Sequence, residues 1–254
     1  MAAELKTLYL DDKTAIPDDI RESGVESLWL RGQCVFDAPE AVTQAAAIRE
    51  LHLSYWARDF IPRPAPEWVF ELEGLERLYF NVNRFSGIGD GINRLTSLVE
   101  LDFGCSLSDL EHFPDLSGLA QLKSLAASGE AVQGQRLPRH SLFPEVLEGI
   151  KGLSQLTTLD LSFWKPSRKA DWLVGEDGRR SIPDVFDRRP NLEDLHLYGM
   201  GLDVLPRSIL ALPHLKKLNI RNNPISRDEV KLVIAGLPGC RIHSDVLDYK
   251  PRKR

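Results

Sequence analysis

Cysteine and methionine are scarce in this chain of 254 residues, which contains three cysteines and two methionines. Cys34, Cys105 and Cys240 lie far apart, so they form neither the clustered pairs of a disulfide framework nor the Cys-x₂-Cys spacing of a zinc site. We therefore expect reduced thiols that serve mainly as packing groups in a cytoplasmic protein.

Long apolar runs are also missing. No uncharged apolar stretch approaches the roughly 20 residues that a membrane-spanning helix needs. The opening MAAELKTLYLDD lacks the basic and then apolar order of a secretory signal. We expect no membrane partner and a cytoplasmic location, with delivery to a host cell by a route other than general secretion as the alternative.

The sequence shows no excess of positive charge and no nucleotide motif. It has 32 basic and 37 acidic residues and a net charge of −5, which argues against nucleic acid as the main partner. It has no G-x-x-x-x-G-K loop and no His-x₃-His spacing. We expect no metal and no cofactor.

An apolar triplet of the form L-x-x-L-x-L recurs through the whole chain. All 27 triplet positions in its nine copies are apolar, and 21 of them are leucine. A pattern of this kind with a period of about 20–29 residues is typical of stacked units, because one unit cannot bury its apolar face alone. The copies begin at Leu5, Val25, Ile48, Leu75, Leu98, Leu122, Leu156, Leu192 and Leu215.

The copies resemble those of bacterial-type leucine-rich repeat (LRR) proteins. Proline-marked segments that are similar to the LPxxIxxL half of such repeats follow several triplets, as in IPDDI at 16–20, IPDVF at 182–186 and LPRSI at 205–209. The resemblance implies an α/β LRR solenoid, with a curved parallel sheet on the concave side and 3₁₀ or short helical turns on the convex side.

The register predicts one solenoid domain over residues 1–254. Ser226 can cap a helix over 227–235, where Val230, Val233, Ile234 and Leu237 share one face. A closing strand is expected near 240–243 and a solvated basic tail at 250–254.

The ninth position of the family pattern is usually asparagine, whose side chain satisfies backbone groups in the turn. Only Asn83 and Asn223 fit it, and Gln33 is a candidate substitute. Trp56 and Trp164 also occupy this position. Because an indole is too large for so narrow a turn, we expect the backbone to depart from the repeat at both tryptophans.

Two copies are longer than the rest, at 34 and 36 residues. Their extra residues fall at about 131–144 and 164–180, on the same edge of the solenoid, and are rich in Arg, Lys and Trp. Insertions in repeat proteins commonly lie on a binding face. We expect these loops, with Trp164 and Trp172, to contribute to a partner site; the alternative is two solvated loops.

The fifth positions of the copies should form one solvent-facing row across the concave sheet, because side chains alternate along a strand. The row begins with four ring residues and continues with acidic, small and polar ones. Three large aromatic residues among four adjacent strands predict an exposed protein-binding ridge. The row is Tyr9, Trp29, His52, Tyr79, Asp102, Ala126, Asp160, His196 and Asn219.

Within this ridge we expect Trp29 and Tyr79 to be the anchors, with Tyr9 and His52 at their margins. The acids are expected to select a basic segment of the partner, and two further ring residues complete the expected site. These remaining residues are Asp102, Asp160, Asp194, His196 and Tyr198.

An enzyme that uses Asp160 and His196 is the alternative. The two lie on adjacent strands, and Ser162 is a diagonal neighbour of His196 at about 7–8 Å, too far for a nucleophile–base hydrogen bond. No G-x-S-x-G elbow accompanies Ser162. We expect a non-catalytic module that binds a protein. A host protein, a signalling component and a toxin to be neutralised all remain open as partners.

Overall fold

The computed structural model describes residues 6–14, 16–17, 19–37, 40–55, 62–82, 85–104, 107, 110–129, 142–164, 178–187 and 189–248. The chain divides into two compact units, Met1–Ala126 and Ala127–Arg254. Each unit is a parallel β-sheet whose strands follow one another in chain order. The expectation of a single domain over the whole length stays a prediction.

Except for the closing β10, each strand of both units begins two residues after the start of a triplet copy. Those of the first unit are β1 (Thr7–Leu10), β2 (Ser27–Arg31), β3 (Glu50–Ser54), β4 (Arg77–Val82), β5 (Glu100–Asp102) and β6 (Ser124–Ala126). Those of the second unit are β7 (Thr158–Asp160), β8 (Asp194–His196), β9 (Lys217–Asn219) and the closing β10 (Arg241–His243).

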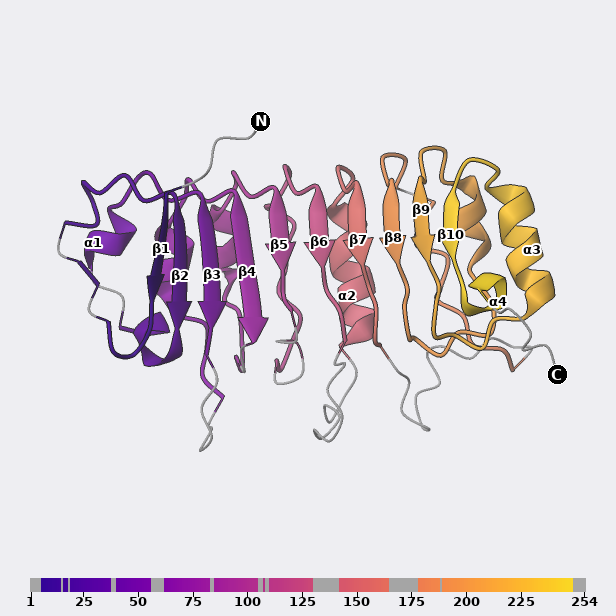
Figure 1. Cartoon of the computed structure of the whole chain (residues 1–254), viewed down its shortest axis with the longest axis horizontal. Coiled ribbons are helices and arrows are strands. Elements are labelled where there is room, and N and C mark those ends of the chain that lie inside the picture. Colours follow the sequence, from indigo (N-terminus) through magenta and orange to yellow (C-terminus); the bar gives the residue numbers. More distant parts are fainter. Residues whose placement is uncertain are drawn as a thin grey trace. The chain divides into compact units, whose positions relative to one another are not determined.

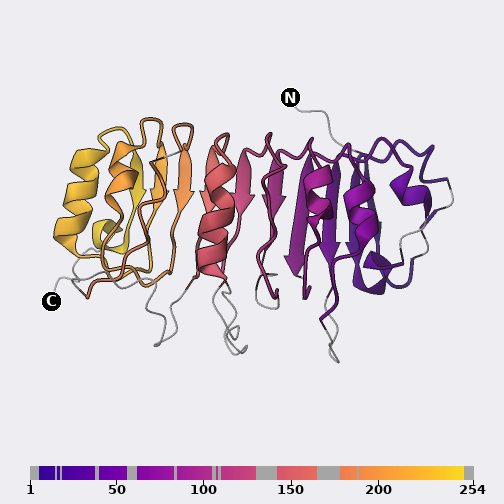
Figure 2. The same cartoon turned by 180° about the vertical axis from the view of Figure 1, so that it is seen from behind.

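Short helices connect the strands and, in each unit, lie mainly behind the sheet in Figure 1 and in front of it in Figure 2. The first unit has η1 (Gly32–Val35), α1 (Glu40–Thr43), η2 (Glu67–Glu71) and η3 (Asp90–Arg94). The second has α2 (Phe143–Gly149), η5 (Ile150–Gly152), η7 (Arg207–Ala211), α3 (Arg227–Gly236) and α4 (Asp245–Asp248). The η elements are 3₁₀ helices. We call the helix-bearing side the covered face, and the opposite side of the strands the open face.

The triplet side chains form the core between the sheet and its helices. Every described triplet residue is buried except Leu8, which is half-buried because β1 is the first strand of its sheet. The expected α/β class with parallel strands and 3₁₀ turns is confirmed.

The side chain of Asn223, at the ninth position of the last copy, holds the turn after its strand together by hydrogen bonds. Asn223 donates from Nδ2 to the Leu197 carbonyl at 2.7 Å, and its Oδ1 accepts from the backbone N–H groups of Met200 and Leu202. The donated bond ties one copy to the sixth position of the copy before it.

Trp164 makes the equivalent bond, so the expected departure of the backbone there is wrong. Its indole N–H donates to the carbonyl of Ala127, the sixth position of the preceding copy, at 2.7 Å. The residue before it, Phe163, has φ 66°, and Asn222 has φ 58° at the same place in its own copy. The turn therefore keeps the backbone of the repeat and needs only a donor of suitable reach.

In the second copy Gln33 does not make this bond, and the nearby Cys34 thiol donates mainly to the Arg31 carbonyl, at 3.1 Å. Cys34, one residue after Gln33, places Sγ 3.8 Å from the carbonyl of Leu10, the sixth position of the first copy. The backbone N–H of Gln33 instead donates to Asp12. Burial raises the pKa of the Cys34 thiol, which keeps it protonated and able to donate.

The last helix follows its expected cap. The Ser226 hydroxyl accepts from the backbone N–H of Glu229 at 3.2 Å, and Val230 and Val233 are buried. Ile234 was expected on the same face, but 41% of it is exposed. It follows Val233 around the helix and lies at the border of the buried stripe.

The first prediction concerns the buried register. We expect Leu159→Asp or Leu195→Asp to abolish the cooperative unfolding transition of the second unit, because an unpaired buried charge costs several kcal/mol and both side chains are fully buried. Urea denaturation followed by circular dichroism measures this. The exposed Gln155→Asp is the matched control. A wild-type transition in either leucine variant would show that the register is wrong.

Candidate binding site on the open face

Four rings from four neighbouring strands form a continuous stack on the open face of the first unit. The register places Tyr9, Trp29, His52 and Tyr79 directly across from one another. The ring centroids of Trp29 and His52 are 3.5 Å apart, and those of His52 and Tyr79 are 4.2 Å apart, with interplanar angles of 10° in both pairs. Tyr9 lies 5.3 Å from Trp29 and is tilted by 37°. We call these residues the ring stack.

The ring stack is less exposed than the sequence suggested. Tyr9 is 66% exposed, Trp29 and Tyr79 are half-buried, and His52 is only 8% exposed. His52 was expected at the margin, yet it lies at the centre with an aromatic ring on each face. Aromatic side chains on adjacent strands shield one another, because their spacing of about 4.8 Å is close to the stacking distance of planar groups.

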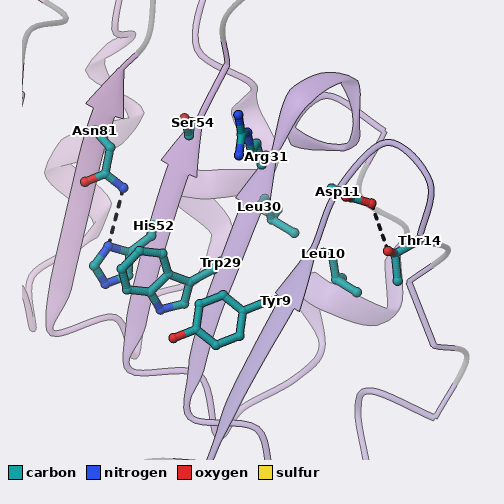
Figure 3. Close-up of a pocket in the computed structure, with 10 residues that line it drawn as sticks. All are labelled: Tyr9, Leu10, Asp11, Thr14, Trp29, Leu30, Arg31, His52, Ser54 and Asn81. Carbon is teal, nitrogen blue, oxygen red and sulfur yellow. Dashed lines mark hydrogen bonds between the residues drawn. The ribbon is translucent and has the colours of Figure 1, made fainter.

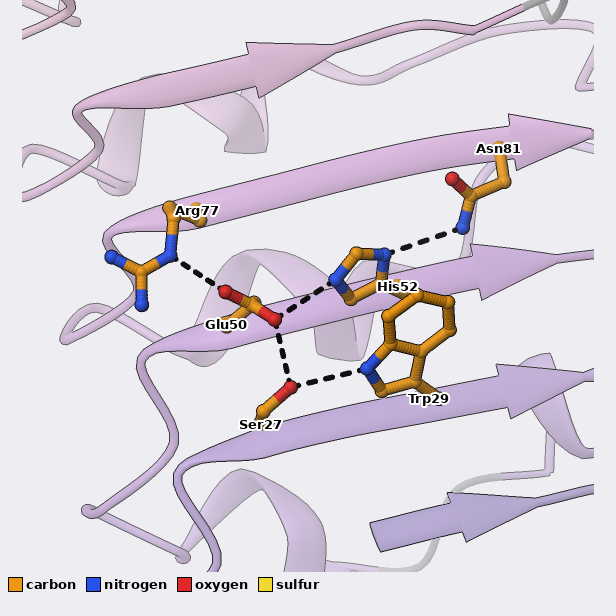
Figure 4. A network of polar contacts seen from close by, with 6 residues as sticks. All are labelled: Ser27, Trp29, Glu50, His52, Arg77 and Asn81. Atoms are coloured by element: carbon orange, nitrogen blue, oxygen red, sulfur yellow. Dashed lines mark hydrogen bonds and ion pairs between the residues drawn. The ribbon is translucent and has the colours of Figure 1, made fainter. Parts of the chain in front are cut away.

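A polar network fixes the ring stack from its side, as Figure 4 shows. Its centre is the Glu50 carboxylate, which accepts from Ser27 Oγ at 2.9 Å, His52 Nε2 at 3.0 Å and Arg77 Nε at 2.7 Å. Ser27 Oγ in turn accepts from the Trp29 indole N–H at 3.2 Å. Glu50 therefore holds two of the four rings.

The network also sets the proton on His52. Because Nε2 faces a carboxylate, it carries the hydrogen, and Nδ1 is then free to accept from the Asn81 amide at 3.4 Å. Burial lowers the pKa of His52 below its usual value, although Glu50 pulls in the opposite direction. The ring is thus held neutral in one tautomer.

Its neighbours have shifted pKa values as well. Burial alone would raise the Glu50 pKa, but hydrogen bonds from Arg77, His52 and Ser27 lower it below its usual value. Burial and the nearby Glu100 carboxylate raise the Tyr79 pKa, so its phenol stays protonated. At neutral pH the network holds one anion, one cation and neutral rings.

A hollow of about 490 Å³ adjoins the ring stack. Tyr9, Trp29 and His52 line one side, as Figure 3 shows. The other side is formed near the carboxyl ends of the strands. The residues lining that side are Leu10, Asp11, Thr14, Leu30, Arg31, Ser54 and Asn81. Its volume falls in the range of about 300–1,000 Å³ that is usual for ligand sites.

Asp102, on the strand after that of Tyr79, stabilises the turn at the end of its own strand. Its Oδ1 accepts from the backbone N–H of Gly104 at 2.6 Å. Gly104 has φ 53°, and a Cβ there would lie 2.3 Å from the Asn81 carbonyl oxygen, so only glycine fits this turn. Asp102 thus has a structural role beside any role in binding.

The open face of the second unit carries Asp160 and His196 side by side, as the register predicted. The acid does not orient the imidazole, however. Asp160 Oδ1 accepts from the backbone N–H of Ser162 at 2.8 Å, whereas His196 Nε2 lies 2.9 Å from Asp194 Oδ1. That contact is short, but it lacks the geometry of a hydrogen bond. Ser162 is 2% exposed, and its hydroxyl accepts from the backbone N–H of Tyr198. The carboxylate–imidazole arrangement that the enzyme alternative requires of Asp160 and His196 is therefore not formed.

The other expected residues of this unit have separate partners. Asp194 Oδ2 accepts from Lys217 Nζ at 2.7 Å, and the Tyr198 ring packs edge-on against Phe163 with centroids 5.0 Å apart. Trp164 is 7% exposed and packs on Phe143, so its expected place on a binding surface is corrected to the core.

Most of the two long loops lies outside the described residues, and so does Trp172. At the described end of the first loop, Phe143 begins α2. At the described end of the second loop, Arg180 pairs with Asp203 through Nε and Nη2 at 3.0 and 3.1 Å. Their expected role in binding stays a prediction.

Among the described residues, no group of three or more His, Cys, Asp or Glu side chains could hold a metal ion. In the same part of the chain, no helix combines the length and apolar character needed to span a membrane.

Comparison with known proteins settles the fold. No model of a protein family matches the sequence. The LRR domain of the type III effector XCV3220 (XopL) superposes with a TM-score of 0.57 at 20% identity, over 94% of this chain and 76% of that one. An internalin (InlF) of Listeria monocytogenes gives a TM-score of 0.55 at 16% identity, over 94% of this chain and 63% of that one.

The chain has the leucine-rich repeat fold.

Two further LRR-containing proteins are similar. The plant peptide hormone receptor RGFR1, in complex with RGF2, has a TM-score of 0.52 at 19% identity, over 95% of this chain and 34% of that one. The volume-regulated anion channel subunit LRRC8B of Mus musculus is 25% identical over 233 residues, which is 91% of this chain. This chain spans 26% of the length of that relative, so the comparison concerns about a quarter of it.

The second prediction concerns the buried histidine. Because the pKa of His52 is lower in the folded protein than in the unfolded chain, the unfolded state binds more protons as the pH falls below about 6.5. The free energy of unfolding should therefore be highest above this pH and decrease between pH 7 and 5. Above pH 5, the low pKa of Glu50 keeps that group ionised.

Urea denaturation across this range measures the slope of the unfolding free energy against pH. In His52→Gln the slope should be smaller than in the wild type, and the exposed His214→Gln should keep it. Equal slopes in wild type and His52→Gln would contradict the buried neutral ring.

The third prediction concerns the stability of the ring stack. Trp29→Ala should lower the free energy of unfolding by about 2 kcal/mol, since it removes two aromatic contacts as well as half-buried area. Removing this shield should also move the His52 pKa up towards its usual value, which an NMR titration detects. Tyr9→Ala, at the exposed end, should cost less than about 1 kcal/mol. Equal losses in both variants would contradict the stack.

Proposed function

We propose that this protein is a non-catalytic binding module that recognises a protein partner through the open face of its first unit, centred on the ring stack. The observation that carries the proposal is the stack itself. Four ring residues meet on the solvent side of a sheet, and the half-buried ion pair of Glu50 and Arg77 helps to fix them in place. A rigid, partly exposed aromatic surface can gain contact area with little loss of side-chain entropy.

The individual rings suit an interface in different ways. Tyr9 offers most of its surface, while Trp29 and Tyr79 are half-exposed and already held by neighbours. Tyr and Trp dominate measured interface energies because each buries a large apolar area with few torsions to freeze. His52 supports the anchors from between them.

The similar structures support a binding role. The plant receptor RGFR1 was determined in complex with RGF2, and the other neighbours include an internalin and an effector. In the described part of this chain, the Ser162 hydroxyl accepts from the Tyr198 backbone and forms no nucleophile–base pair with His196. The same residues contain no cluster of side chains that could hold a metal ion.

We further infer that the protein is bacterial and that it is located in the cytoplasm. The alternative is that it is delivered to a host cell. The LPxxIxxL segments and the effector neighbour support the origin. The free thiols of Cys34 and Cys240 suit a reducing compartment. Burial raises the pKa of Cys240 to about 11, which keeps this thiol unreactive at neutral pH.

Asp102 belongs to the proposal as a margin rather than an anchor, because it lies on β5, next to Tyr79, and already accepts a hydrogen bond from the Gly104 backbone. Asp160 and Asp194 lie in the second unit, and their expected role in selecting a basic segment stays a prediction of its own. Charges at the rim of an interface act mainly on the association rate. His196 and Tyr198 also lie in the second unit, and their expected binding role likewise stays a separate prediction.

The fourth prediction tests which face binds. A partner is captured by affinity purification from the native cell and purified, and its affinity is measured by calorimetry. Tyr9→Ala and Tyr79→Ala should each weaken binding by about 2 kcal/mol, roughly 30-fold, mainly through faster dissociation.

Trp68→Ala is the matched control on the covered face. Its indole is half-buried and donates to the Val35 carbonyl at 2.9 Å, so the cost of removing a tryptophan is comparable. Wild-type affinity in both tyrosine variants, together with loss of binding in Trp68→Ala, would place the site on the covered face and end the proposal.

A further inference from the structure

The hollow beside the ring stack contains a charged group that makes no ion pair among the described residues, although its charge helps to lower the pKa of the neighbouring Asp11. In the first unit, Arg49 pairs with Glu76 at 3.7 Å, and Arg77 pairs with Glu50 at 2.7 Å. Arg31, at the end of β2, is exposed, and no carboxylate lies within ion-pair distance of it in the described part of the chain.

Asp11, the one acid that lines the hollow, is already engaged. Its Oδ1 accepts from the backbone N–H of Lys13 at 3.0 Å and from the Thr14 hydroxyl at 2.9 Å. These two bonds lower the pKa of Asp11 and hold it in its own turn. Figure 3 shows the Arg31 guanidinium on the side of Ser54, pointing away from Asp11. The guanidinium is therefore available to a group that enters the hollow.

The charge of the hollow favours a carboxylate over a phosphate. Its lining holds one guanidinium and one carboxylate, and the remaining residues are neutral. A planar guanidinium matches a carboxylate through two parallel N–H···O bonds. A phosphate brings up to two negative charges, which this lining does not balance, into a protein whose net charge is −5.

The spacing of the hollow matches an extended peptide. Trp29 and Arg31 lie two residues apart on β2, and both side chains point to the open face. Two residues of a strand span roughly 6.6 Å, which is also the distance between alternate side chains of an extended ligand. A peptide that lies along β2 can therefore place one side chain against the rings and the next but one against Arg31.

We propose that the hollow binds an extended segment of a protein partner in which an aromatic residue and an Asp or Glu stand two positions apart. The aromatic side chain packs on Tyr9 and Trp29, and the carboxylate pairs with Arg31. Ser54 and Asn81 offer further hydrogen bonds at the same strand ends. This inference rests on the proposed function and names the chemistry of the partner.

Synthetic peptides test it directly. The probes are acetyl-GYGDG-amide and its reverse acetyl-GDGYG-amide, with acetyl-GYGNG-amide and acetyl-GYGKG-amide as neutral and basic counterparts. Each is titrated into the ¹⁵N-labelled protein while the Trp29 indole N–H signal is followed. One of the two acidic peptides should bind at least about tenfold more tightly than the neutral one, as expected for a charge-assisted pair.

Protein variants locate the charge. Arg31→Gln should remove the preference for the acidic peptide, and Arg49→Gln, outside the lining of the hollow, should retain it. Tyr9→Ala should weaken all the peptides alike. Arg31→Gln should not change the packing of the core, because Arg31 is exposed.

Three results would overturn the inference. These are equal or undetectable binding of all four peptides, preference for the basic peptide, and tighter binding of adenosine monophosphate than of any peptide. If the basic peptide binds more tightly and still shifts the Trp29 indole N–H signal, this inference is wrong, but the open face remains the binding surface. The proposed function fails separately, when the purified partner binds normally to the tyrosine variants.

Discussion

Every feature of this protein depends on the burial of three apolar side chains in each repeat. The triplet of one copy packs against the triplets of the copies on either side. A single repeat of about 25 residues cannot bury its own triplet. The triplets must therefore stay in register from strand to strand. Because side chains alternate along a strand, this same constraint places the fifth positions in a row on the open face. The order of the rings on the surface follows from the order of leucines in the core.

The ring stack depends in addition on one half-buried anion, Glu50. A carboxylate out of water is costly unless its oxygens are hydrogen-bonded and its charge is matched. Glu50 meets both conditions through Ser27, His52 and Arg77. In return it fixes the His52 tautomer and, through Ser27, the Trp29 indole. A surface of aromatic side chains becomes a platform of defined shape, which lowers the entropy that a partner must overcome.

Periodicity predicted the strands, the last helix and the membership of the ring row, because these follow from backbone register alone. It did not predict how far the rings are buried. Whether Trp29 and Tyr79 enclose His52 depends on side-chain rotamers, which a pattern does not contain. A signal for the network was nevertheless present, since Ser27, Glu50 and Arg77 occupy the third position of three successive copies. A donor, an acid and a base across adjacent strands predict a shared hydrogen-bond network. The prediction for Trp164 was wrong because it rested on side-chain volume. The indole N–H reaches the Ala127 carbonyl, so the large ring does not disturb the turn.

The most direct test of the account is hydroxyl-radical footprinting of the purified protein with and without its partner. It reads the exposure of aromatic side chains without any substitution, so loss of folding cannot imitate loss of binding. The account predicts strong protection of Tyr9 and Trp29 in the complex and unchanged oxidation of Trp68 on the covered face. Protection of Trp68 with unchanged oxidation of Tyr9 and Trp29 would contradict it.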